Sequence, residues 1–247
     1  MSAMGIVAKN TFIKIFSKTK YKVFIILTAI INFLIAFVLT SGTVSLGNTP
    51  FAFNSSSSAY TTLNILSGFV FPLIIFLLCA DFYTQEVSDN SIKAELLRPV
   101  KRESIYCGKA IGILYYIIAT IGINLALSVI FTAIWGNSSL IPRIILAYFV
   151  TILPCVIIIL FSGMISVCAN QSSLSIFISI IVMVALSAIS LLNVNFNVIF
   201  FTGYFSWYKL FIGIIPLQNI LPAVGVLCSS GVIFYLIGNT LFEKKNI

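Results

Sequence analysis

Long apolar runs constrain this chain more than any other feature of its sequence. Hydrophobic residues make up 60% of the 247 residues and charged residues only 8%, whereas soluble domains carry about 25% charged residues. A membrane span needs about 20 apolar residues, so the chain has room for about six spans and their loops. We therefore predict an all-α, polytopic membrane protein that forms one domain, residues 1–247, in the plasma membrane.

The predicted spans follow the apolar runs and the polar residues that bound them. They cover residues 23–40, 63–80, 105–135, 144–167, 174–192 and 220–242. Pro72 and Pro154 fall inside the second and fourth spans, where a missing backbone N–H favours a kink. Gly108 and Gly112 form a pair of small residues that permits close helix contact.

Basic residues flank the spans and predict their orientation. With six spans and both termini inside, twelve of the fourteen basic residues and all six acidic residues face the cytoplasm. The positive-inside rule therefore predicts cytoplasmic termini. The net charge of +8 then reflects topology, and we expect membrane lipids and no nucleic acid as partners. Residues 1–22, with five lysines, are predicted to form a cytoplasmic interfacial segment; the alternative is a basic tail that only sets orientation.

An aromatic segment between the last two spans is apolar enough to suggest a seventh. A span there would move Lys244 and Lys245 to the outer side, against the charge rule. Its Trp and Tyr residues are typical of the headgroup level. We therefore predict that residues 193–219 form a re-entrant or interfacial segment on the outer face.

One long polar interval, residues 81–109, separates the second and third spans. It reads DFYTQEVSDNSIKAELLRPVKRESIYCGK and holds five of the six acidic residues. Burying each charge in hydrocarbon costs about 2.5–3.5 kcal/mol, so we expect residues 81–104 to form a cytoplasmic loop in water.

The polar interval also carries helix signals. Capping residues at positions 88–91 favour a helix start, and Ile92 and Leu96 then share one face. Pro99 should end this helix within about two turns, and a second helix should begin near Lys101. The pattern predicts a short amphipathic helix across the cytoplasmic ends of two spans.

The spacing of this interval resembles the signature of permease subunits of type-2 ABC exporters, among them small permeases for antimicrobial-peptide immunity or multidrug export. The match runs through Glu86, Asn90-Ser91-Ile92-Lys93, Leu96, Arg98-Pro99-Val100, Arg102 and Gly108-Lys109. Asn90 stands where that family has Gly, and Asn tolerates a left-handed backbone better than most residues.

The resemblance implies a coupling helix that docks on a separate ABC ATPase subunit, and a dimer with a second permease copy or a paralogue. The residues expected to take part in coupling and docking are Glu86, Ile92, Lys93, Leu96, Leu97, Pro99, Arg102 and Lys109. Arg102 and Lys109 could pair with Glu86 or Asp81, with acidic groups on the partner, or with lipid phosphate.

Catalytic motifs are absent from the sequence. The phosphate-binding pattern G-x-x-x-x-G-K-[ST] fails at Gly108-Lys109, because Glu103 replaces the first Gly and Ala110 follows the Lys. There is no His, and the predicted spans hold no ionisable group near their middle. We therefore expect no enzyme activity, no metal site and no cofactor in this chain, with ATP and Mg bound by the partner ATPase.

Two functions remain open at this point. The first is the membrane half of an ATP-driven exporter for a hydrophobic or amphipathic peptide, drug or lipid. The second is a membrane sensor or immunity protein that binds an amphipathic peptide without moving it. Asn32 and Asn124 could line a substrate path, although such residues more often hydrogen-bond between helices, contributing about 0.6 kcal/mol.

Overall fold

The computed structural model describes residues 3–40, 58–89, 101–135, 138–192, 200–211 and 220–245, and every regular element in these ranges is helical. Six helical stretches are long and apolar enough to cross a membrane: Thr19–Val38, Ser58–Ser88, Arg102–Ile134, Ile141–Cys168, Ser172–Ile189 and Ile220–Lys244. The prediction of an all-helical chain with six membrane-spanning helices is confirmed for these residues.

The helices follow one another in a simple order. They are α1 (Ala3–Ser17), α2 (Thr19–Thr40), α3 (Ser58–Ile65), the π-helical turn η1 (Leu66–Val70), α4 (Phe71–Cys79), the π-helical turn η2 (Ala80–Gln85), α5 (Glu86–Ser88), α7 (Arg102–Trp135), η3 (Ser138–Leu140), α8 (Ile141–Val150), α9 (Ile152–Cys168), α10 (Ser172–Leu192), η4 (Phe201–Tyr204), α12 (Tyr208–Phe211) and α13 (Ile220–Lys244).

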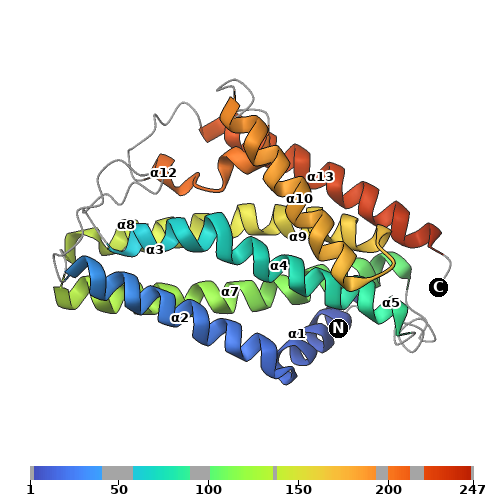
Figure 1. Ribbon diagram of the computed structural model, residues 1–247, viewed down its shortest axis with the longest axis horizontal. Coiled ribbons are helices and arrows are strands. Elements are labelled where there is room, and N and C mark those ends of the chain that lie inside the picture. The colour runs from blue at the N-terminus through green and yellow to red at the C-terminus, as the bar shows by residue number, and fades with distance from the viewer. Residues whose placement is uncertain are drawn as a thin grey trace.

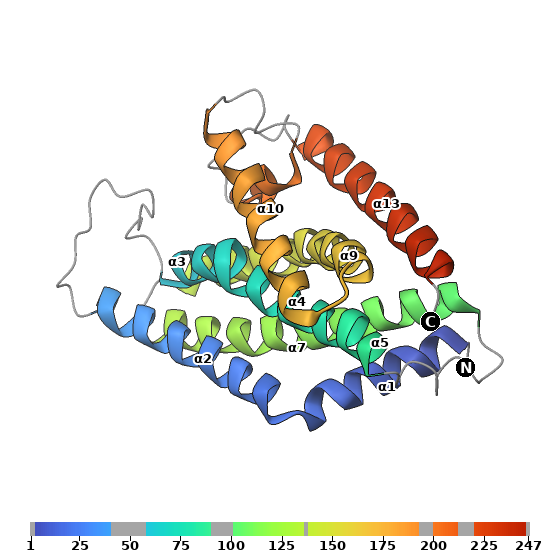
Figure 2. The ribbon, with the colours of Figure 1, turned by 45° about the vertical axis from the view of Figure 1, so that its right-hand side comes forward.

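Helices α2, α7, α3–α4 and α8–α9 run along the long axis of the molecule, whereas α10 and α13 tilt away from them (Figure 1). Helix α1 meets α2 at an open angle and packs against the first part of α7 (Figure 2). Both chain ends lie at the same end of the bundle as α5 and the start of α7 (Figure 1).

The outer faces of the bundle suit a hydrocarbon solvent. Large apolar side chains are exposed along α2, α10 and α13, as at Phe37 (63%), Phe177 (66%) and Leu236 (54%). Exposed apolar surface on this scale is unfavourable in water but costs nothing against lipid tails. The chain therefore has the surface of a multi-pass membrane protein.

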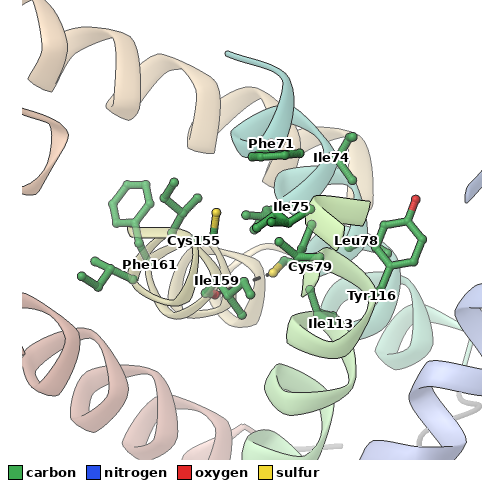
Figure 3. Close-up of a cluster of buried hydrophobic side chains, with 14 of the residues drawn as sticks. Phe71, Ile74, Ile75, Leu78, Cys79, Ile113, Tyr116, Cys155, Ile159 and Phe161 are labelled. Atoms are coloured by element: carbon green, nitrogen blue, oxygen red, sulfur yellow. Dashed lines mark hydrogen bonds between the residues drawn. The ribbon is translucent and has the colours of Figure 1, made fainter. Parts of the chain in front are cut away.

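The core lies where α4 passes between α7 and α9. Figure 3 shows Ile75 and Cys79 of α4 facing Ile159 of α9 and Ile113 of α7. The Cys79 thiol donates to the Ile159 carbonyl at 3.7 Å. Lipid tails are as apolar as these side chains, so close packing and its dispersion contacts hold the helices together.

The fourth predicted span is broken into α8 and α9 at Thr151. Pro154 has no N–H for the carbonyl of Val150, four residues earlier in the helix. The indole N–H of Trp207 donates to that carbonyl at 2.9 Å instead. A residue from the outer aromatic segment thus satisfies the backbone group that the proline leaves free.

The described part of the outer aromatic segment, residues 200–211, consists of the short turns η4 and α12. Phe201, Trp207 and Tyr208 are buried, and the Phe201 ring lies 5.3 Å from that of Phe161 in α9 and 5.4 Å from that of Phe234 in α13. These aromatic residues therefore pack against α9 and α13 inside the bundle. In this range no helix is long enough to span a membrane.

The second span extends further than its apolar run. The helix continues without a break from α4 through η2 and α5 to Ser88, and Asp81 and Thr84 are buried. The structure therefore differs from the prediction of a water-exposed loop beginning at residue 81. The next described helix, α7, begins at Arg102, next to the predicted start at Lys101.

Candidate functional site

Six charged side chains meet where the second span ends, and we call them the charge cluster. They come from α1, the α1–α2 bend, α2, η2, α5 and α7: Lys14, Lys18, Lys20, Asp81, Glu86 and Lys109. Both flanks of the polar interval contribute to the charge cluster. The charge cluster therefore connects the end of the second span, at α5, to the start of the third span, at α7.

Lys109 and Glu86 form the most buried pair of the charge cluster. The Lys109 side chain is 1% exposed, and its Nζ donates to Glu86 Oε2 at 2.6 Å and to the Phe82 carbonyl at 2.9 Å. Lys14 of α1 donates to the other oxygen of Glu86 at 3.1 Å. A buried ammonium is tolerated only when it is paired and hydrogen-bonded, as here.

Asp81 is the second acidic centre of the charge cluster. The Tyr21 hydroxyl donates to its Oδ2 at 2.5 Å, Lys18 Nζ lies 3.6 Å from the same oxygen, and Lys20 also pairs with it. Tyr116 of α7 donates to the Tyr21 carbonyl at 2.8 Å. Asp81 thus ties the start of the first span to the end of the second.

The π-helical turn η2 explains why both acids lie on the side of the second span that faces the lysines of α1 and the α1–α2 bend. Asp81 and Glu86 are five residues apart. The i to i+5 bonding of a π-turn brings such residues onto neighbouring positions, whereas an α-helix turns them to different sides. Single π-turns inside helices are frequent at functional sites.

Glycines allow α1 to lie close to α7 beside the charge cluster. A Cβ at Gly108 would lie 2.7 Å from Val7 Cβ, and one at Gly112 would lie 2.6 Å from Thr11 Cβ. Any side chain at either position would push α1 away. The close helix contact expected of this glycine pair is therefore made within the chain, with α1.

Arg102 lies elsewhere and does not pair with Glu86 or Asp81. It donates to the carbonyls of Glu243 at 2.8 Å and Lys245 at 3.0 Å, at the C-terminal end of α13. Lys245 in turn donates to the Val167 carbonyl at 2.6 Å and the Ala169 carbonyl at 3.3 Å, at the end of α9. Partial burial lowers the pKa of Lys245. Cations at helix C-termini stabilise the last carbonyls and the helix dipole.

Asn32 and Asn124 bind neighbouring helices to each other. Asn32 Nδ2 donates to the Asn124 carbonyl and to Ser128 Oγ, both at 3.0 Å, and Asn124 Nδ2 donates to Thr28 Oγ1 at 3.1 Å. Ser128 also shares a 2.7 Å hydrogen bond with Tyr148 of α8. Both Asn side chains are buried in the contact between α2 and α7, which is the interhelical role expected for them.

The remaining predicted site residues, Ile92, Lys93, Leu96, Leu97 and Pro99, lie outside the described residues. Sequence reasoning named Asp81 only as a possible partner of Arg102 or Lys109. It missed Tyr21 and the three lysines Lys14, Lys18 and Lys20 as members of the same site. The available signal was a set of closely spaced lysines just before the first span and an acid just after the second.

Comparison with known proteins places the chain in one family. A family described as "Protein of unknown function (DUF2705)" matches residues 25–247. The match begins within α2 and includes Asp81, Glu86 and Lys109, whereas the lysines of α1 and the α1–α2 bend precede it. No curated protein matches the chain significantly.

Proposed function

We propose that this chain, which belongs to the DUF2705 family, is the membrane-spanning subunit of an ATP-driven exporter that works with separate ABC ATPase subunits. It would move a hydrophobic or amphipathic peptide, drug or lipid out of the cell or the membrane. The partner would bind ATP and Mg and hydrolyse the nucleotide. We further propose that two such permeases, identical or paralogous, form the complete transport path.

The pair between Glu86 and Lys109 is the observation that supports this proposal most. These residues lie on either side of the segment that resembles a coupling helix, and their charged atoms are 2.6 Å apart. A docking helix can move spans only if its base is stiff. The Glu86–Lys109 pair, with Lys14, provides a stiff base connected to α1, α5 and α7.

The proposed orientation in the membrane is supported by the elements that share one end of the bundle. The start of α1, the end of α13, helix α5 with Glu86, and the start of α7 lie at one end of the bundle (Figure 1). The excess of basic residues there favours the cytoplasmic side of the plasma membrane. The aromatic segment with η4 and α12 would then lie on the outer side as a re-entrant element.

The proposal can be tested by purifying the tagged chain from its native membranes in a mild detergent. We expect an ATPase with a phosphate-binding loop to copurify, and the complex to hydrolyse ATP. The chain without that partner should not. A chain that binds an amphipathic peptide but never retains an ATPase would instead be the sensor or immunity protein considered above.

A further inference from the structure

We propose that a groove along the first turns of α7 binds the alkyl chain of a single-chain amphiphile, and that Glu103 holds its cationic head group. Calling this ligand a substrate rests on the proposed export function. The binding itself requires no ATPase and is tested without one.

The α7 groove lies between α1, α7, α9 and α13 and has a volume of about 160 Å³. Its α7 side consists of Tyr106, Cys107, Ala110, Ile111 and Leu114, and Tyr235 of α13 closes one side. Pockets for drug-sized molecules measure about 300–1,000 Å³. A groove of this size and apolar lining suits one alkyl chain better than a ring system or two acyl chains.

The spacing of the lining residues defines the direction of the groove. Positions 103, 107, 110 and 114 share one face of α7, so Glu103 continues the apolar stripe by one turn towards the end of the bundle. The rise from Glu103 to Leu114 is about 16 Å at 1.5 Å per residue. One leaflet of the hydrocarbon core is about 15 Å thick, so the stripe has the length of one leaflet.

Glu103 is the charged group that is joined directly to the lining. The Tyr235 hydroxyl donates to Glu103 Oε1 at 2.9 Å, and the Cys107 thiol donates to that hydroxyl at 3.4 Å. Two nearby cations, Arg102 and Lys245, donate instead to the carbonyls at the ends of α13 and α9. Among the described charged side chains, that of Glu103 is hydrogen-bonded to a residue that lines the groove, so the proposal assigns the head-group contact to this carboxylate, which favours a cation.

The test uses the full-length chain alone in nanodiscs of phosphatidylcholine. The probe is a tetradecyltrimethylammonium ion with a photoreactive group near the end of its chain. We expect saturable cross-links to the peptide that contains residues 106–114. Unlabelled tetradecyltrimethylammonium should compete about tenfold better than tetradecyl sulfate, because only the cation is attracted to Glu103.

Two substitutions separate the head-group site from the groove. Glu103→Gln keeps an acceptor for Tyr235 but removes the charge, so the cation should lose its roughly tenfold advantage while neutral tetradecyl maltoside competes as before. Glu243→Gln is the matched control: it removes the charge of a different exposed carboxylate, on α13, and should leave the advantage of the cation unchanged. Ala110→Phe should fill the groove and abolish cross-linking by the alkyl probe.

Three results would overturn the proposal. Labelling that never saturates would mean that no site exists. Stronger competition by tetradecyl sulfate than by the cation would mean that the exposed lysines, Lys101 and Lys244, form the head-group site and that its ligand is an anionic lipid. An unchanged cation preference in Glu103→Gln would remove the carboxylate from the site, whether or not Ala110→Phe folds. None of these outcomes affects copurification of an ATPase, so failure here is distinguishable from failure of the proposed function.

Discussion

Replacing Glu86 by Gln is expected to lower the free energy of unfolding by about 3 kcal/mol, the lower end of the cost of breaking a buried ion pair. Gln keeps the shape of Glu86 and one acceptor but removes the charge 2.6 Å from Lys109 Nζ. The Lys109 side chain is only 1% exposed, so water cannot replace that carboxylate.

The opposite substitution should cost less. In Lys109→Met, Glu86 loses its buried partner but keeps Lys14 at 3.1 Å and is itself 12% exposed, so we expect a loss of about 1–2 kcal/mol. The double variant Glu86→Gln/Lys109→Met should be more stable than Glu86→Gln alone, because the uncompensated buried charge has gone as well.

These differences can be measured by reversible unfolding of the purified chain in mixed micelles of mild detergent and SDS. Glu103→Gln is the matched control, since Glu103 is exposed and a change there should cost at most about 1 kcal/mol. The reasoning is refuted if Glu86→Gln is no less stable than this control, or if the double variant is less stable than Glu86→Gln.

Three further predictions concern packing, the broken fourth span and topology. Gly112→Ala places a Cβ 2.6 Å from a side-chain carbon of α1 and should lower the free energy of unfolding by about 1–3 kcal/mol. In the control, Gly122→Ala, the added Cβ meets nothing within 4 Å, so this variant should be neutral or slightly more stable. Thermal melting of the two variants compares them. Trp207→Phe removes the indole donor to the carbonyl that the proline leaves free and should cost about 1–3 kcal/mol in the same assay. A membrane-impermeant thiol reagent added outside should label a Cys at Ser56 and not one at Asn246; labelling at Asn246 would mean that residues 193–216 cross the membrane and would contradict the six-span topology.

The span layout could be predicted from the sequence because it depends on local composition. Apolar runs identified all six membrane-spanning helices, and the start of α7 was predicted within one residue. The break before Pro154 also follows from local chemistry, since proline lacks an N–H. Its repair by Trp207 does not, because the two residues come from segments far apart in the chain.

Of the charge cluster, only the pair between Lys109 and Glu86 was among the sequence-based expectations. The rest could not be predicted, because it depends on tertiary contacts with α1 and α2. Composition placed Asp81 in water, yet Tyr21 donates a hydrogen bond to it and Lys18 balances its charge, both from about 60 residues earlier in the chain. The π-turn that brings Asp81 and Glu86 onto one side has no sequence signal that we could use. Arg102, expected near these acids, instead caps α13 by donating to the carbonyl of Glu243, which comes 141 positions later.

Binding of the ATPase to the polar interval tests the central claim most directly. Ile92→Ala/Leu96→Ala removes the two apolar side chains expected to enter the partner's groove, while Lys93→Ala is the matched control on the same predicted helix. Truncating a buried interface anchor costs about 2 kcal/mol or more, so the double variant should bind the ATPase at least about thirtyfold more weakly than wild type. Lys93→Ala should bind within about threefold of wild type. ATPase binding by Ile92→Ala/Leu96→Ala at the wild-type affinity would contradict the assignment of this chain as a transporter subunit.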